Sequence, residues 1–194
     1  MHLNTDLIFR EPGQRHVLCF WNTRSYWPLA YHPGQNALYV PYVDNCMDMT
    51  AATVAAPDQP AVPEKRVGTR RQGTDLANFA GVAKINMSTG EIKRIYVGKA
   101  PGNGAMLATA GDLVFWGDLD QHFRAFDAAT GKVLWETTVN GAIQNSTITY
   151  GVNGKQYVAI LTGEGALTGG LIDQAGLQPA RRHNAVYVFA LPEP

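Results

Sequence analysis

The segment from Ala125 to Trp135 constrains the fold of this chain more than any other part of its sequence. It reads Ala-Phe-Asp-Ala-Ala-Thr-Gly-Lys-Val-Leu-Trp and lies between two strand-like apolar runs. The Asp127 and Thr130 side chains can accept hydrogen bonds from backbone amides just ahead of them, and Gly131 can adopt a positive φ at no steric cost. Apolar and polar residues alternate on both sides of this turn, so the segment predicts a β-hairpin.

The rest of the chain gives frequent strand signals and almost no helical periodicity. No long window carries apolar residues at i, i+3 and i+4, whereas short strand-like runs recur, some of them joined by clear turns such as Asn153-Gly154. Charged residues make up only 16% of the 194 residues, and 20 glycines and 11 prolines imply many turns. We therefore predict an all-β fold that occupies residues 1–194.

The charge balance and the chain start exclude some classes of protein. Sixteen Lys and Arg residues balance sixteen Asp and Glu residues, so no basic surface predicts nucleic-acid binding. No apolar run approaches the length of a membrane span. The N-terminus has no basic stretch followed by an apolar core, so it is not a secretory signal. Because residues 7–9 look like a strand entered midway, we expect the chain to be a portion of a larger protein.

A weak internal repeat links residues 83–94 to residues 125–134. Both begin with Ala and share a Thr-Gly turn, but Asn86 stands where the second copy has Asp127. A repeat at a spacing of about 42 residues is typical of β-propellers, in which each blade is a four-stranded antiparallel sheet. The chain has room for about four such blades.

Two segments break the strand pattern and are predicted to be long surface loops. Residues 51–75 are rich in Ala, Pro and Gly and end in a basic stretch, and residues 162–184 are rich in Gly. Long loops of propellers usually gather over one face, where ligands bind.

The hairpin segment also resembles a known family signature. It matches every defined position of the tryptophan-docking motif Ala-x-Asp-x-x-Thr-Gly-Lys-x-x-Trp of quinoprotein alcohol dehydrogenases, which use pyrroloquinoline quinone (PQQ). Segments 27–33, 108–115, 154–159 and 186–192 extend the resemblance over most of the chain. The chain thus resembles the C-terminal portion of a PQQ-dependent methanol or ethanol dehydrogenase. This implies about four blades of an eight-bladed, periplasmic propeller, with Trp135 packed between neighbouring blades.

The resemblance implies part of an enzyme that oxidises a primary alcohol to an aldehyde with hydride transfer to the quinone. In the family, the calcium or lanthanide ligands and the catalytic Asp come from the N-terminal half, so we assign no catalytic or metal-binding residue to this chain. Asp118 and Asp120 are better explained as turn caps than as metal ligands. The implied partners are the missing half or a second copy of the chain, a small alcohol, and a cytochrome c as candidate electron acceptor.

The resemblance also points to cofactor-binding residues. PQQ is a flat quinone with three carboxylates, so a protein holds it by stacking on its faces and by hydrogen bonds. Ser25, Tyr26 and Trp27 fall in the segment that reaches the quinone, although Tyr26 and Trp27 are equally suited to packing between blades. Asn103 and Gly104 fall where the family often has a Trp before a Gly pair. The Asn103 amide suits a quinone carbonyl or carboxylate, and an Asn-Gly turn is the alternative.

A second class of function stays open. Ser25 and Asn103 differ from the residues that the family uses. A non-catalytic propeller module would keep the docking turns and use its face to bind a protein partner. The two hypotheses differ in whether the intact protein binds PQQ.

The chain has two cysteines, Cys19 and Cys46. Their spacing alone allows two buried free thiols or one disulfide. Soluble alcohol dehydrogenases of the family carry a disulfide in the corresponding stretch, so the resemblance implies a Cys19–Cys46 disulfide.

We predict that the protein contains this disulfide under oxidising conditions. Closing a loop of about 27 residues should stabilise the fold by roughly 3 kcal/mol, because the crosslink restricts the unfolded chain. Mass spectrometry of the non-reduced protein tests the pairing, and the finding of two free thiols would reject it.

Overall fold

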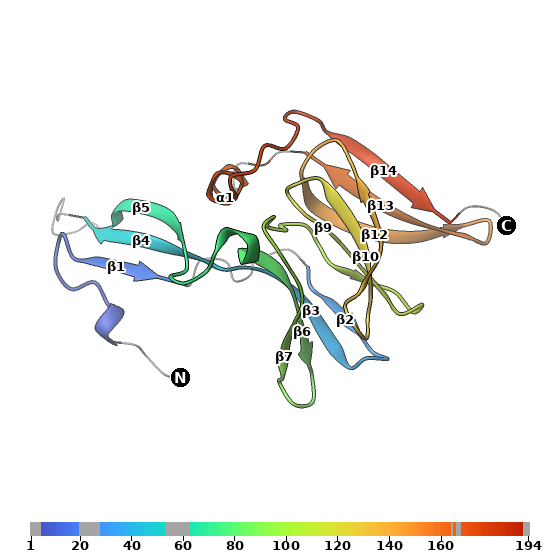
Figure 1. Ribbon diagram of the computed structural model, residues 1–194, viewed down its shortest axis with the longest axis horizontal. Coiled ribbons are helices and arrows are strands. Elements are labelled where there is room, and N and C mark those ends of the chain that lie inside the picture. Colours follow the sequence, from blue (N-terminus) through green and yellow to red (C-terminus); the bar gives the residue numbers. More distant parts are fainter. Residues whose placement is uncertain (1–4, 20–27, 53–62, 164, 166–167, 192–194) are drawn as a thin grey trace, which may run out of the picture.

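The computed structural model describes residues 5–19, 28–52, 63–163, 165 and 168–191, in which strands dominate (Figure 1). Every strand pairing among these residues is antiparallel, and the all-β prediction is confirmed. In chain order the elements are η1 (Thr5–Leu7), β1 (Arg15–Leu18), β2 (Ala30–His32), β3 (Ala37–Val43), β4 (Asn45–Ala51), β5 (Pro63–Arg70), η2 (Leu76–Asn78), β6 (Ala80–Asn86), β7 (Ile92–Gly98), β8 (Leu107–Ala108), β9 (Leu113–Gly117), β10 (His122–Asp127), β11 (Val133–Thr138), β12 (Ile143–Val152), β13 (Lys155–Thr162), α1 (Gly169–Ala175) and β14 (Ala185–Ala190).

Three of the four sheets lie together and have the strand order of propeller blades (Figure 1). The first sheet is β2-β3-β6-β7, the second is β8-β9-β10-β11 and the third is β12-β13-β14. Within each sheet, hydrogen-bonded neighbours follow one another in the chain, apart from an excursion between β3 and β6. No helix in the described part of the chain is long and apolar enough to cross a membrane.

The fourth sheet, β1-β4-β5, lies apart from the three blades, toward the left of Figure 1. β5 belongs to the segment 51–75, so the prediction of a loop throughout that segment is wrong for residues 63–70, which pair with β4. This strand is basic and lies at a sheet edge, so it lacks the apolar alternation of a covered strand. Segment 162–184 likewise contains α1, which is too short to give a helical period.

The turn of the 125–135 motif has the predicted geometry. The Asp127 carboxylate accepts hydrogen bonds from the backbone amide and the hydroxyl of Thr130, both at 2.7 Å, and Gly131 has a φ of +77°. In the weak repeat, Asn86 accepts from the amides of the two residues that follow Met87, and Gly90 has a φ of +74°. The sequence repeat is therefore a repeat of turn geometry.

The first sheet holds this turn of the second sheet. The Tyr39 hydroxyl donates a hydrogen bond to the carbonyl oxygen of Ala128. The Lys84 ammonium donates to the same oxygen at 3.0 Å and to the Ala129 carbonyl oxygen at 3.2 Å. Tyr39 is fully buried in an apolar cluster with Trp116 and other residues of both sheets. Polar and apolar contacts thus join the two sheets at one place.

Trp135 is less buried than the resemblance implies. Its side chain is 40% exposed, and it contacts Phe123 and Phe189 edge-on, with ring centroids 6.0 and 5.3 Å away. The prediction that it lies between blades is right in position, because Phe123 is on β10 and Phe189 is on the next sheet, but wrong in degree of burial. Among the described residues, no strand lies beside β14 to cover it.

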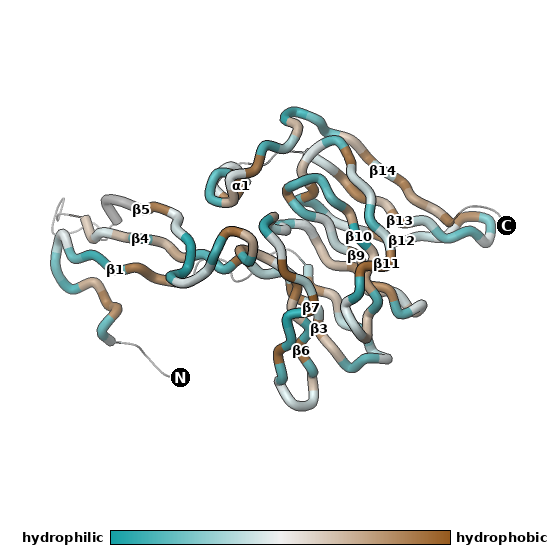
Figure 2. Tube along the Cα trace, in the orientation of Figure 1, coloured by the Kyte–Doolittle hydropathy of each residue, from teal (hydrophilic) through white to brown (hydrophobic). Residues whose placement is uncertain are grey.

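Apolar residues recur along the strands of the three-sheet stack (Figure 2), and some of those on its two outward faces are exposed. On the third sheet, Ile148 and Val188 flank Ala159 in register and are 53% and 50% exposed. On the first sheet, Tyr31 and Ile92 lie in one cross-strand row, 51% and 67% exposed. Exposed sheet faces of this kind are typical of surfaces that another element covers.

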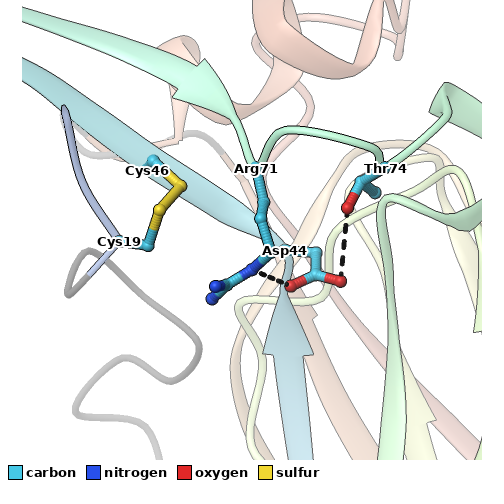
Figure 3. Close-up of a disulfide and its surroundings, with 5 residues drawn as sticks. All are labelled: Cys19, Asp44, Cys46, Arg71 and Thr74. Atoms are coloured by element: carbon cyan, nitrogen blue, oxygen red, sulfur yellow. Dashed lines mark hydrogen bonds and ion pairs between the residues drawn. A yellow bond between two sulfur atoms is a disulfide. The ribbon is translucent and has the colours of Figure 1, made fainter.

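The segment between β3 and β6, which contains β4 and β5, leaves the first sheet at Asp44 (Figure 3). The buried Asp44 carboxylate accepts hydrogen bonds from Arg71 at 2.8 Å, Arg94 at 3.1 Å and Thr74 at 3.5 Å. The predicted Cys19–Cys46 disulfide is present, and it joins the end of β1 to β4 (Figure 3).

Replacement of Tyr39 should weaken the joint between the first two sheets. Tyr39→Phe removes the hydroxyl that bonds Ala128, so the free energy of unfolding at neutral pH should fall by about 1 kcal/mol. Tyr31→Phe is the matched control, because its hydroxyl bonds Asn36 at an exposed site. Urea denaturation measures both, and equal losses would contradict the role of Tyr39.

The same residue predicts a pH dependence. Burial raises the pKa of Tyr39 from 10.0 to about 12. Between these values the unfolded chain loses the tyrosine proton while the native protein keeps it, so stability falls as pH rises through this range. In Tyr39→Phe this part of the alkaline loss should be absent. If the stability of Tyr39→Phe falls above pH 10 in the same way as that of the parent, the raised pKa does not belong to Tyr39.

Candidate functional site

Three segments, which we call the loop junction, meet beside the first strands of the second and third sheets. They are residues 101–106 before β8, the start of β12 at residues 143–147, where the strand register is irregular, and residues 163, 165 and 168 after β13. The Ala105 amide donates to the Asn145 carbonyl oxygen at 3.1 Å, and the Thr147 hydroxyl donates to the Ala105 carbonyl oxygen at 3.1 Å. The Gln144 amide donates to the Gly163 carbonyl oxygen at 2.6 Å. Hydrogen bonds therefore fix the three segments together.

Asn103 lies within this junction and is 5% exposed. In the described part of the chain, no hydrogen bond involves its side-chain amide. The Asn103 amide is not among the fully buried polar groups that lack a partner, so its atoms are accessible and can bind a ligand oxygen or a water molecule.

Gly104 is needed for close packing rather than for turn geometry. A Cβ atom added at this position would lie 3.3 and 3.4 Å from the carbonyl oxygens of Asn145 and Ile143. Its φ is not positive, and residues 103–104 run between β7 and β8 without a hydrogen-bonded turn. Gly104 thus lies close against two carbonyl oxygens of the start of β12, and a side chain at this position would crowd them.

Gly102 has a similar role beside Trp116. A Cβ atom at Gly102 would overlap the Trp116 indole, which is fully buried. The Pro101 carbonyl oxygen also accepts the Leu119 amide at 2.8 Å. The segment that carries Asn103 is therefore held rigidly from the second sheet.

The other predicted cofactor contacts, Ser25, Tyr26 and Trp27, lie outside the described residues. The residue that follows them, Pro28, accepts a hydrogen bond from the Met106 amide at 3.1 Å. The chain directly after the predicted contacts is thus bonded to the loop junction, next to the segment that carries Asn103.

Sequence reasoning missed a second buried amide, Asn45 on β4. Asn45 is fully buried, and neither its oxygen nor its nitrogen has a hydrogen-bond partner. An Asn beside Asp44, directly after a run of apolar strand residues, was the signal that marked it.

Asp118 has a structural role, as the turn-cap interpretation predicts. Its carboxylate accepts the amides of Asp120 at 2.9 Å and His122 at 3.0 Å, and it pairs with Arg124 at 2.6 Å. Burial raises the pKa of the Asp118 carboxyl, and the Arg124 guanidinium opposes that shift. Arg124 in turn lies over the Tyr96 ring of the first sheet and pairs with Glu136. These charges stabilise the contact between the first two sheets and are not available to a ligand.

The electrostatics of the loop junction are those of a neutral hydrogen-bonding surface. Among the described residues, no group of three or more His, Cys, Asp or Glu side chains could hold a metal ion. The buried polar side chains of the junction are amides and hydroxyls, namely Asn103, Gln144, Thr147 and Thr168. The Thr147 and Thr168 hydroxyls and the Gln144 amide already donate to backbone carbonyl oxygens, so Asn103 is the one of these four side chains that makes no hydrogen bond to the described residues. Amides and hydroxyls carry no charge, so these groups cannot neutralise an anionic ligand.

Comparison with known proteins finds similarity to quinoprotein dehydrogenases. The PQQ family described as the β-propeller domain of glucose, ethanol and alcohol dehydrogenases matches residues 68–158. The quinoprotein ethanol dehydrogenase of Pseudomonas aeruginosa is 30% identical over 192 residues, which is 94% of this chain and 30% of that protein. The lanthanide-dependent methanol dehydrogenase of Methylorubrum extorquens is 35% identical over 150 residues, which is 76% of this chain and 24% of that protein.

A solved structure gives the same result. A europium-containing methanol dehydrogenase superposes with a TM-score of 0.78 and 25% identity over 93% of this chain and 36% of that chain. The chain therefore spans about a quarter to a third of the length of the proteins that it matches.

Substitution of Gly102 should disturb the loop junction. Gly102→Ala forces a methyl group against Trp116, and overpacking of this kind costs about 1–3 kcal/mol. Gly111→Ala is the matched control, because a Cβ at Gly111 meets nothing within 4 Å. Thermal unfolding measures the difference, and a Gly102→Ala protein as stable as the control would show that the 101–106 segment is not packed in this way.

Proposed function

We propose that this chain supplies three blades and one wall of the cofactor site of a PQQ-dependent alcohol dehydrogenase. The proposal starts from its homology to part of the β-propeller of such enzymes. The observation that carries the proposal is Asn103, a residue only 5% exposed whose amide makes no hydrogen bond to the described residues, in a loop junction that hydrogen bonds hold together. Homology supports the cofactor class, and the geometry of the junction supports the part that this chain plays.

In this proposal, Asn103 donates a hydrogen bond to a carbonyl or carboxylate oxygen of PQQ. Gly104 allows the segment that carries Asn103 to pack closely against the start of β12, and Trp116 packs against the same segment at Gly102. Ser25, Tyr26 and Trp27 are proposed to contribute a further contact, since Met106 bonds the adjoining Pro28. Bound PQQ supplies the hydride acceptor for a primary alcohol, which leaves as the aldehyde.

The charged groups of the reaction are proposed to lie outside this chain. A calcium or lanthanide ion, its ligands and the carboxylate that accepts the alcohol proton would come from the remainder of the propeller. Since Asp118 and Asp44 are committed to arginines, neither is free for those roles. We further propose a periplasmic location and a cytochrome c as electron acceptor, by analogy with the family.

The remainder of a propeller is a better partner than a second copy. Both outward faces of the stack are apolar, so both are proposed to be covered by further blades. Three blades cannot be repeated to give the eight blades that the family resemblance implies, so copies of this chain alone do not close such a ring.

A non-catalytic propeller module that binds a protein partner is the second candidate. The neutral character of the loop junction favours it, because no described residue there would balance the cofactor carboxylates. The two candidates differ in one measurable property, which is affinity for PQQ.

Titration of the chain with PQQ, followed by quinone absorbance, separates these candidates. We expect weak binding that Asn103→Ala weakens about tenfold, because loss of one hydrogen bond to a charged or polarised oxygen costs about 1.5 kcal/mol. Asn153→Ala, in the distant β12–β13 turn, should bind like the parent. With calcium added, the chain alone should oxidise no alcohol.

Two results would contradict the proposal. If the parent and Asn103→Ala bind PQQ with equal affinity, the loop junction does not form a wall of the cofactor site, and the protein-binding module is favoured. Alcohol oxidation by the chain alone would show that it contains the acid–base and metal groups after all.

A further inference from the structure

The fourth sheet brings a histidine and two methionines to one of its faces. β1 and β4 are neighbours in this sheet (Figure 1), with His16 opposite Met49 and Leu18 opposite Met47. Successive side chains of a strand point to opposite faces of its sheet, so Met47 and Met49 share a face, and His16 lies on the same face. We call His16, Met47 and Met49 the His-Met cluster.

The spacing of the strands allows these three side chains to meet. Residues directly opposite each other in antiparallel strands have Cβ atoms about 5 Å apart, and diagonal neighbours such as His16 and Met47 are about 7–8 Å apart, within reach of long side chains. The register of β4 is regular from Asn45 to Thr50, so no bulge turns either methionine to the other face. The flexible methionine side chain can bring its sulfur to a neighbouring group.

The imidazole of the cluster has an unused nitrogen. His16 Nε2 is buried and makes no hydrogen bond to the described residues. The Phe9 ring lies against the imidazole, with ring centroids 4.9 Å apart, and Met49 is 8% exposed. A buried polar atom without a partner costs free energy, and thioether sulfurs are only weak hydrogen-bond acceptors. The two methionines therefore leave His16 Nε2 in need of a partner that binds nitrogen and sulfur alike.

No acidic or thiol group takes part in the cluster. Asp48 lies between the two methionines in sequence but on the opposite face of β4, where it accepts a hydrogen bond from Arg15 Nε at 2.7 Å. Cys46 is on that opposite face too and is bonded to Cys19. The cluster thus offers one imidazole nitrogen and two thioether sulfurs, all of them uncharged.

These ligand atoms discriminate among metal ions. Zn²⁺ in proteins takes thiolates, imidazoles and carboxylates, and Ca²⁺ takes oxygen ligands, so a set without an anion suits neither ion. Thioether sulfur is a soft ligand that selects Cu(I), and imidazole also binds copper. Arg66, which lies opposite Met49 on β5 and is exposed, repels a divalent ion twice as strongly as a monovalent one. Both properties favour a soft ion with a single charge.

We propose that His16, Met47 and Met49 form a binding site for Cu(I). The imidazole binds the ion through Nε2, and the two thioethers complete its coordination. The ion joins β1 to β4, so its binding stabilises the fourth sheet, in which β1 is an edge strand of four residues. This site lies outside the loop junction, and the inference does not depend on the proposed function.

The test measures binding of Ag(I), a redox-inert analogue of Cu(I), and of Cu(I) kept reduced by ascorbate without oxygen, in competition with a chromophoric Cu(I) chelator. The Cys19–Cys46 disulfide is first shown to be intact with a thiol reagent, because free thiolates would bind either ion. Met49→Leu removes one sulfur at almost constant volume. Met87→Leu is the matched control, because Met87 is 52% exposed in the turn before β7.

We expect the parent to bind one ion per chain, with an affinity that Met49→Leu lowers at least about tenfold and Met87→Leu leaves unchanged. The melting temperature of the parent should rise with Ag(I), and that of Met49→Leu should rise less. In protein labelled with ¹³C at the methionine methyl groups, Ag(I) should shift the Met47 and Met49 signals and leave those of Met87 and Met106 in place. This last measurement uses the parent alone, so it does not depend on how well a variant folds.

Three outcomes would overturn the proposal. The first is the absence of Ag(I) and Cu(I) binding by the parent chain. The second is binding that Met49→Leu leaves unchanged, or that shifts all methionine methyl signals alike, because it would show an adventitious ion only. The third is displacement of Ag(I) by an equal concentration of Zn²⁺, because the site would then not be selective for a soft ion.

Discussion

The contact between the Ala128 carbonyl oxygen and the first sheet is the interaction on which the arrangement of the blades depends. A hydroxyl from Tyr39 and an ammonium from Lys84 meet at that single oxygen, at the end of a turn that Asp127 has already closed. The turn thus places the Ala128 carbonyl oxygen where side chains of the first sheet can bind it. Apolar packing around Trp116 adds buried surface between the two sheets, but such packing is not directional. The hydrogen bonds are directional, so they set the position of one sheet against the next.

Local chemistry explains which parts of the fold could be predicted from the sequence. The turns at Asp127 and Asn86 depend on side chains within three residues, so a linear motif contains all their information. β5 and α1 were missed because pairing with β4 and burial of Leu171 and Ile172 stabilise them, and neither gives a periodic pattern. The exposure of Trp135 could not be read from its motif, since it depends on a strand of another sheet.

The candidate site was accessible to sequence reasoning only through resemblance. Asn103 stands out because a family motif passes through it, and the structure adds that the residue is only 5% exposed while its amide makes no hydrogen bond to the described residues. Asn45 has no such motif; its place after an apolar strand was the only sign in the sequence, and the structure adds that both of its amide atoms are buried without partners. Acidic residues that look equally reactive in the sequence prove to be counterions of arginines, which no spacing rule would have indicated.

The excursion through β4 and β5 has a consequence for the order of events during synthesis. β3 cannot pair with β6 until residues 44–79, which lie between the two strands in the sequence, have left the ribosome. Until then β3 has one hydrogen-bonded neighbour, β2, and its other edge is open. Because the cost of closing a loop grows only with the logarithm of its length, the detour is cheap at equilibrium. Its effect is kinetic: the first blade is completed late, so the nascent chain has an interval in which that open edge can be bound by a chaperone or by another chain.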